Sequence, residues 1–313
     1  MTITERYNQI YTSEIASKSR NIIIKYSPVK NQHVFSPFRH AVGINSVENL
    51  AQIMRKNLLF YCYGEEEVVK HYQQGNFLNL EQAAQYAYKM RLPMRPIQTD
   101  GLPSEVLLDL LIQLYTPDSY KMAVRPLLRQ QDNNEIKGYD LTYFSISKQT
   151  TGLWLGQAKL GEKDYCKRGI HKDLLSKFKT DYLCKQMFFV CEKSIGTSPE
   201  AEKLTTIINR VNIATLNQDN EIRHKALLEC FKENNISIFI PCLLAYGAGS
   251  VYSSIEEIFQ NMDSETKDMQ KYFLQWNYEF SGFCPEILFY IFPIEDIERL
   301  RDTKRGFYYG LRA

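Results

Sequence analysis

The chain has 313 residues, of which 44% are hydrophobic, and this composition excludes an intrinsically disordered protein. Its length suits one large domain or two domains of average size. A formal net charge of +2 excludes a strongly basic protein, so a contact with nucleic acid would have to come from a local cluster of cations.

The cysteines and the apolar runs indicate the cellular compartment. The seven cysteines are odd in number and contain no CxxC pair, which favours free thiols in a reducing environment. The first 21 residues lack the apolar core and cleavage site of a signal peptide. The longest apolar runs, 236–246 and 286–294, are too short to span a bilayer. We therefore expect a soluble, cytoplasmic protein without membrane contact.

Residues 1–98 are predicted to form an N-terminal α+β region. Short apolar runs predict strands at 21–27 and 58–64. Helically spaced apolar residues predict helices at 65–73 and 80–90. Pro93 and Pro96 then interrupt the pattern and predict a boundary near residue 98.

Residues 99–250 have the element order of an α/β core. Ser104 is a plausible N-cap for a helix that is apolar on almost every side, and such a helix is expected to be buried. The segments that follow predict three strands (121–129, 138–147 and 152–160), a basic helical stretch (164–190), two helices (198–234) and a strand (236–245). This order predicts a mixed central sheet with flanking helices.

Residues 251–313 are predicted to form a C-terminal extension that packs on this core. Its pattern indicates an amphipathic helix over 254–276, a strand over 286–293 and a last helix near 294–304. The fold class is therefore α/β, with additions at both ends of the core.

Polar side chains gather where the strands 138–147 and 152–160 would pair. The short connection between them suits a hairpin, which sets the start of the first strand beside the end of the second. Asp140 opens the first strand, and Gln157 and Lys159 close the second on one face, because side chains alternate with period two. Glu105, in the first turn of the preceding helix, is expected to reach the same end of the sheet.

This cluster suits a hard divalent cation. The side-chain oxygens of Asp140, Gln157 and Glu105, with the backbone carbonyl of Ala158, form a donor set for Mg²⁺ or Mn²⁺. Such a metal makes its bound water easier to deprotonate and steadies charge on a phosphoryl oxygen. Lys159 is expected to orient the nucleophile and to stabilise the charge that develops at phosphorus. The predicted chemistry is phosphodiester hydrolysis.

The pattern of Asp140, then Gln157-Ala158-Lys159, with Glu105 on a preceding helix, resembles the PD-(D/E)XK or restriction-endonuclease-like signature in its QxK form. The chain from about 100 to 250 is more closely similar to the HamA family, through the segments LPSEVLLDLLIQLY, IKGYDLTYF, LWLGQAKLG and ISIFIPCLLAYG. HamA proteins are the nuclease-like subunits of the Hachiman anti-phage defence system. Gln157 departs from the family pattern, which has an acidic residue there, and an amide binds a cation less strongly than a carboxylate does.

The resemblance implies a restriction-endonuclease-like core over 99–250 and a metal-dependent DNA nuclease. It also implies a helicase partner, the HamB subunit, and DNA damage directed at infected cells. The terminal additions and long helices would dock that helicase.

A basic stretch follows the predicted site. Residues 159–193 contain nine lysines and arginines against five acids, and cations here would hold phosphates without reading sequence. The candidates for DNA contact are Lys163, Lys167, Arg168, His171 and Lys172. Lys163, Lys167 and His171 are spaced by four residues and would share one helix face. An ordinary solvated helix face is the alternative interpretation of this stretch.

Two functions remain open on this sequence. The first is a metal-dependent nuclease, and the second is a catalytically weak or inactive adaptor that binds DNA or the helicase, with Gln157 marking a decayed site. The presence of both Asp140 and Lys159 favours the nuclease, because a decayed site has no need to keep them. Glu105 also fits a structural role, since an acid in the first turn of a helix complements its dipole.

Overall fold

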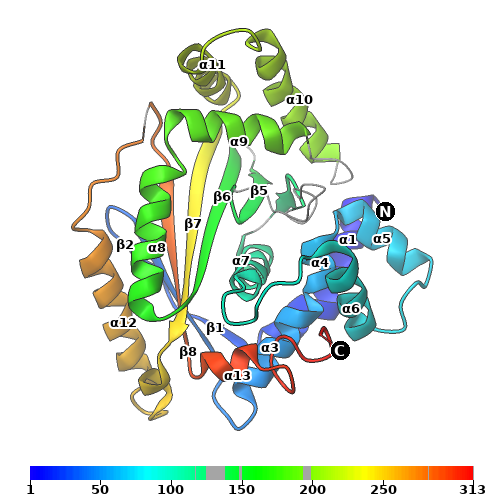
Figure 1. Ribbon diagram of the computed structural model, residues 1–313, viewed down its shortest axis with the longest axis vertical. Coiled ribbons are helices and arrows are strands. Elements are labelled where there is room, and N and C mark those ends of the chain that lie inside the picture. The colour runs from blue at the N-terminus through cyan, green and yellow to red at the C-terminus, as the bar shows by residue number, and fades with distance from the viewer. Residues whose placement is uncertain (117, 125–137, 148–149, 193–198, 281, 313) are drawn as a thin grey trace.

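The computed structural model describes residues 1–116, 118–124, 138–147, 150–192, 199–280 and 282–312. They form a mixed sheet with helices against both of its faces, as Figure 1 shows. The predicted α/β class, with a central sheet and flanking helices, is confirmed.

The N-terminal region contributes helices and three short strands. In chain order these are α1 (Ile3–Tyr11), a π-helical turn (Thr12–Ala16), α2 (Ser17–Ser19), β1 (Ile23–Lys25), β2 (Val29–Lys30), β3 (Val34–His40), α3 (Ser46–Lys56), α4 (Leu58–Cys62), α5 (Glu65–Gln73) and α6 (Leu80–Arg91).

The central part of the chain follows the predicted order of helix, three strands, helices and strand. Its elements are α7 (Leu102–Tyr115), β4 (Ser119–Lys121), β5 (Leu141–Ile146), β6 (Thr151–Gly161), α8 (Lys163–Ser176), α9 (Thr180–Glu192), α10 (Pro199–Ala214), α11 (Asn220–Glu233) and β7 (Ile236–Gly247). The C-terminal part adds a 3-10 turn (Gly249–Tyr252), α12 (Ile258–Phe273), β8 (Glu286–Ile294) and α13 (Ile297–Arg301).

Several predicted elements differ from the structure. The run 58–64, expected as a strand, begins with the helix α4, whose five residues are all buried. An apolar run that is buried on every side has no periodicity to separate helix from strand. The strand predicted over 121–129 is a shorter β4 that ends at Lys121, and residues 125–129 lie outside the described chain. The basic stretch 164–190 divides into α8 and α9.

The sheet has the strand order β1-β3-β8-β7-β6-β5-β4, with β2 paired to β3. Strands β3, β8, β7 and β6 run parallel, whereas β5 and β4 continue the sheet in antiparallel pairing. The expected hairpin is confirmed, because β5 and β6 pair from Leu141 opposite Gly156 to Ile146 opposite Thr151. The division of the chain at residues 98 and 250 stays a prediction, although β3 and β8 join the same sheet.

Side chains that alternate along β6 enter two different cores. Leu153 and Leu155 pack among residues of α8 to α12, whereas Ala158 and Leu160 pack among α7 and the N-terminal helices. In Figure 1, α8 and α7 accordingly lie on opposite sides of the sheet. Gly156 lets α7 approach closely, since a Cβ atom built there would lie 2.8 Å from Leu108 Cδ2. Within the described chain, no helix has the length and apolarity to cross a membrane.

Candidate functional site

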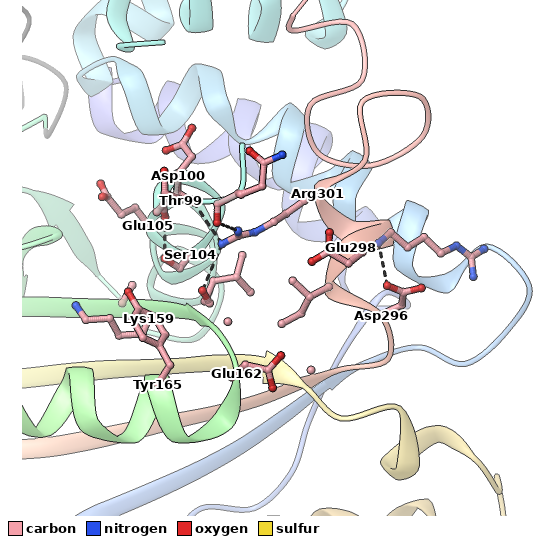
Figure 2. Close-up of a pocket in the computed structure, with 18 of the residues that line it drawn as sticks. Thr99, Asp100, Ser104, Glu105, Lys159, Glu162, Tyr165, Asp296, Glu298 and Arg301 are labelled. Carbon is pink, nitrogen blue, oxygen red and sulfur yellow. Dashed lines mark hydrogen bonds between the residues drawn. The ribbon is translucent and has the colours of Figure 1, made fainter. Parts of the chain in front are cut away.

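The carboxyl ends of the parallel strands β6, β7 and β8 border a cleft of about 1010 Å³. Open α/β sheets bind ligands outside the carboxyl ends of their strands. Figure 2 shows Glu105 of α7 and Lys159 of β6 on one side of this cleft and Asp296 and Glu298 on the other.

Asp140 lies against the end of β6, as the hairpin predicted. Its Oδ2 accepts a hydrogen bond from the backbone N–H of Ala158 at 2.9 Å, and its own N–H donates to the Gly156 carbonyl at 2.9 Å. Asp140 is 8% exposed and lines the cleft together with Ala158 and Lys159. The turn of the chain into β5 therefore fixes a carboxylate beside the last residues of β6.

Glu105 reaches the same cleft from the first turn of α7. The helix begins at Leu102 with Gly101 as its N-cap, so Ser104 is not the cap that the sequence predicted. Tyr61 of α4 donates a hydrogen bond to Glu105 Oε2 at 2.6 Å, and both groups are buried. The N-terminal region thereby orients a carboxylate of the site.

Gln157 points away from the cleft lining. Its side chain has no exposed surface, and Gln157 is not among the described residues that line the cleft. Its Oε1 accepts a hydrogen bond from the Lys177 ammonium, and its Nε2 donates to the Gly156 carbonyl at 2.7 Å. An amide oxygen bonded to an ammonium group is a poor ligand for a second cation, because the two charges repel. The ligand role expected for Gln157 stays a prediction.

Lys159 shares the α8 side of the sheet with Gln157, and its tip meets a carboxylate. Lys159 Nζ donates to Asp173 Oδ2 at 2.5 Å, and the same oxygen lies 3.4 Å from Lys177 Nζ. Burial lowers the pKa of Lys159, but the negative charges of Asp140 and Asp173 outweigh this effect and raise that pKa above its usual value. The group is therefore a protonated ammonium at neutral pH.

Contacts within the chain engage three of the five candidates for DNA contact. Lys163 pairs with Glu265 and Asp268 of α12, each at 2.7 Å. Lys167 pairs with Asp268 at 2.6 Å, and the His171 ring lies 3.1 Å from a tyrosine hydroxyl. The face they share is thus partly covered by α12 and the segment after it, while the exposed candidates are Arg168 and Lys172.

The cleft fits a hard cation with a small donor set. Its described lining carries seven carboxylates and four cations, namely Asp100, Glu105, Asp140, Glu162, Glu295, Asp296 and Glu298 against Arg95, Lys159, Arg299 and Arg301. Mg²⁺ binds one or two protein carboxylates and keeps several waters. The carboxylates of Glu105 and Asp140, with the Ala158 carbonyl, are ligands of the type that it requires. Among the residues that the structure describes, no three His, Cys, Asp or Glu side chains gather closely enough to form a protein-only metal cage.

Three residues around the site were not foreseen from the sequence. Asp173 and Lys177 lie four residues apart on a predicted helix, so the sequence indicates that they share a face of that helix. It does not indicate which element that face contacts. Tyr61 lay in a run predicted as a strand, and its contact with α7 had no signal in the sequence.

Comparison with known proteins identifies the family. No curated protein matches the sequence. The model of one family, HamA, matches residues 12–308, which spans the terminal regions as well as the core around the cleft. The chain therefore belongs to the HamA family of nuclease-like anti-phage defence proteins.

Proposed function

We propose that this protein is a metal-dependent DNA nuclease that acts in anti-phage defence together with a helicase subunit. The observation that carries the proposal is the convergence of Glu105, Asp140, Ala158 and Lys159 on one cleft from three separate elements. Two carboxylates, a carbonyl and an ammonium at the end of a sheet are the groups that metal-assisted phosphodiester hydrolysis uses.

Each of these residues has a role in the proposed reaction. The carboxylates of Glu105 and Asp140, with the Ala158 carbonyl, would hold Mg²⁺ or Mn²⁺, which when bound supplies Lewis-acid chemistry. Lys159 orients the attacking water and stabilises negative charge that develops on the phosphoryl oxygen. Water loses a proton and adds to phosphorus, the bond from phosphorus to the leaving oxygen of the strand breaks, and that oxygen takes up a proton.

The first test is cleavage of supercoiled plasmid DNA by the purified protein, alone and with its helicase, in Mg²⁺, Mn²⁺ or EDTA. Wild-type protein should nick the plasmid only with metal, and Lys159→Ala should lower the rate by about 10²–10³-fold, the typical cost of losing a transition-state donor. Lys267→Ala, an exposed lysine on α12 paired with an acid, is the matched control and should cleave like wild type. No metal-dependent cleavage, with or without the helicase, would contradict the proposal.

A second test measures the metal directly. Titration calorimetry with Mn²⁺ should show binding that Asp140→Asn weakens by at least about tenfold, because the variant loses an anionic oxygen ligand. Asp263→Asn makes the same change on an exposed part of α12 and should bind as wild type does. Equal binding by Asp140→Asn and wild type would remove Asp140 from the site.

The adaptor remains the second candidate, and one observation favours it. Gln157 stands at the second acidic position of the family pattern, and its oxygen accepts from Lys177. An adaptor would bind DNA or the helicase without metal-dependent cleavage. The plasmid assay, combined with a DNA-binding measurement on the same preparation, separates the two functions.

A further inference from the structure

One face of α8 surrounds the Lys159 side chain. Gly169, Asp173 and Lys177 follow at intervals of four residues, so they lie on the same side of the helix. Each of the three contacts β6 through a different atom group: Gly169 borders the stem of Lys159, Asp173 binds its ammonium, and Lys177 binds Gln157.

Gly169 provides the space in which the Lys159 stem lies. A Cβ atom built at Gly169 would be 3.0 Å from Lys159 Cε, 3.1 Å from Cδ and 3.2 Å from Cγ. Carbon atoms pack best at about 3.5–4.0 Å, so any larger residue would displace the stem. Glycine inside a helix lowers stability by about 0.5–1 kcal/mol relative to alanine. Here the glycine lies at the position that contacts the Lys159 stem.

Asp173 fixes the end of the same side chain. The distance from Lys159 Nζ to Asp173 Oδ2 is 2.5 Å, and the two side chains are 19% and 14% exposed. Partial burial and a short, charge-assisted hydrogen bond restrict the ammonium far more than an exposed ion pair would.

The Gln157–Lys177 pair contacts the same carboxylate oxygen of Asp173 that binds Lys159. Lys177 donates to Gln157 Oε1 and lies 3.4 Å from Asp173 Oδ2, so one lysine links the amide to the carboxylate. A carboxylate at position 157 would attract Lys177 more strongly and compete with Asp173 for it. A neutral amide satisfies Lys177 without that competition, which gives Gln157 a physical reason to be there.

We propose that Asp173 is a positioning residue for Lys159, with Gly169 giving the lysine stem a fixed path and the Gln157–Lys177 pair holding Asp173 in place. The inference rests on the proposed nuclease function and deepens it. Asp173 acts through Lys159 and touches no substrate.

Cleavage kinetics test this role. Asp173→Asn should lower kcat by about 10–100-fold and leave KM for plasmid DNA within about twofold, because a misplaced ammonium weakens the chemical step. In a Lys159→Ala background the same change should alter the rate by less than about twofold, since residues that act as a unit are not additive. Asp164→Asn, an exposed acid in the first turn of α8, is the control and should match wild type.

A measurement that needs no activity keeps the two proposals apart. In NMR spectra of protein labelled with ¹³C-lysine, the two Hε protons of an immobilised Lys159 should give separate signals, and these should merge in Asp173→Asn. If wild type fails to cleave DNA but shows separate signals that merge in the variant, the nuclease proposal fails and the positioning of Lys159 by Asp173 stands.

Other outcomes would overturn the positioning role. Separate Hε signals in Asp173→Asn together with wild-type kcat would do so, as would an equal loss of rate in the presence and absence of Lys159. Should Asp173→Asn fail to fold, Gly169→Ala perturbs the same lysine without changing any charge. It should also lower kcat at constant KM, and wild-type kinetics in Gly169→Ala would refute the proposal.

Discussion

Asp109 is a buried acid on α7 whose replacement is expected to lower the stability of the protein. Its carboxylate accepts hydrogen bonds from Tyr143 at 2.6 Å, Gln113 at 2.7 Å and Asn57 at 2.8 Å, and it lies 3.9 Å from Lys121 Nζ. The Asp109 and Lys121 side chains are only 4% and 2% exposed. Burial lowers the pKa of Lys121, and Asp109 is the first of the charges that oppose this effect.

Replacing Asp109 by Asn should lower the free energy of unfolding by about 3–5 kcal/mol, the usual cost of removing one partner of a buried ion pair. Three hydrogen bonds to a charged group would add to more than this at about 1.5–3 kcal/mol each, but such contributions are not additive within one network. Urea unfolding followed by circular dichroism measures the change as a shift in the midpoint at constant slope.

A second substitution identifies the cause of this loss. Adding Lys121→Met to Asp109→Asn should restore about 2 kcal/mol, because it removes the buried ammonium that the first change deprives of its main opposing charge. Asp263→Asn, at an exposed acid of α12, should shift stability by less than about 0.5 kcal/mol. A loss below about 1 kcal/mol in Asp109→Asn, or no recovery in the double variant, would refute the reasoning.

Two further predictions concern packing and pH. Gly156→Ala should destabilise the protein by about 1–3 kcal/mol, because its methyl group would lie 2.8 Å from a Leu108 methyl and 2.9 Å from Leu141 Cβ. Gly247→Ala is the control, since its methyl group would lie 3.6 Å from the nearest atom. In the same urea assay its stability should stay within about 0.5 kcal/mol of wild type. Burial lowers the pKa of His40 to about 4, so between pH 6.5 and 4 the unfolded chain binds more protons and stability falls as the pH falls. From pH 7.5 to 5 this amounts to about 2 kcal/mol, and His40→Gln should lose that part of the pH dependence; an unchanged dependence would contradict the assignment.

The hairpin and its polar end could be predicted because the information is local. Two short strands with a short connection fix their own register, and the period of two then places Gln157 and Lys159 on one face. The same alternation places Gly156 on the opposite face, where α7 approaches closely. These features depend on about twenty consecutive residues.

What the sequence could not supply is the identity of the partners across that sheet. Gln157 was expected to bind a metal and Lys159 to orient the nucleophile, yet their described neighbours are Asp173 of α8 and Lys177 at its C-terminal end. The docking of a helix on a sheet depends on the whole core, and the pattern of α8 alone does not say which strand it covers. The same limit applies to Tyr61, whose contact with Glu105 joins residues 44 positions apart.

The parallel pairing of β3 with β8 has a consequence for how the chain is made. Val34 lies opposite Leu288, so during synthesis one edge of β3 stays unpaired until β8 is made about 250 residues later. At about 5–20 residues per second the ribosome needs roughly 12–50 s to cover that distance. For this interval β3 offers unpaired N–H and C=O groups to any other strand in reach. Until β8 pairs with it, this edge of β3 is a site at which aggregation or chaperone binding is expected in the nascent chain.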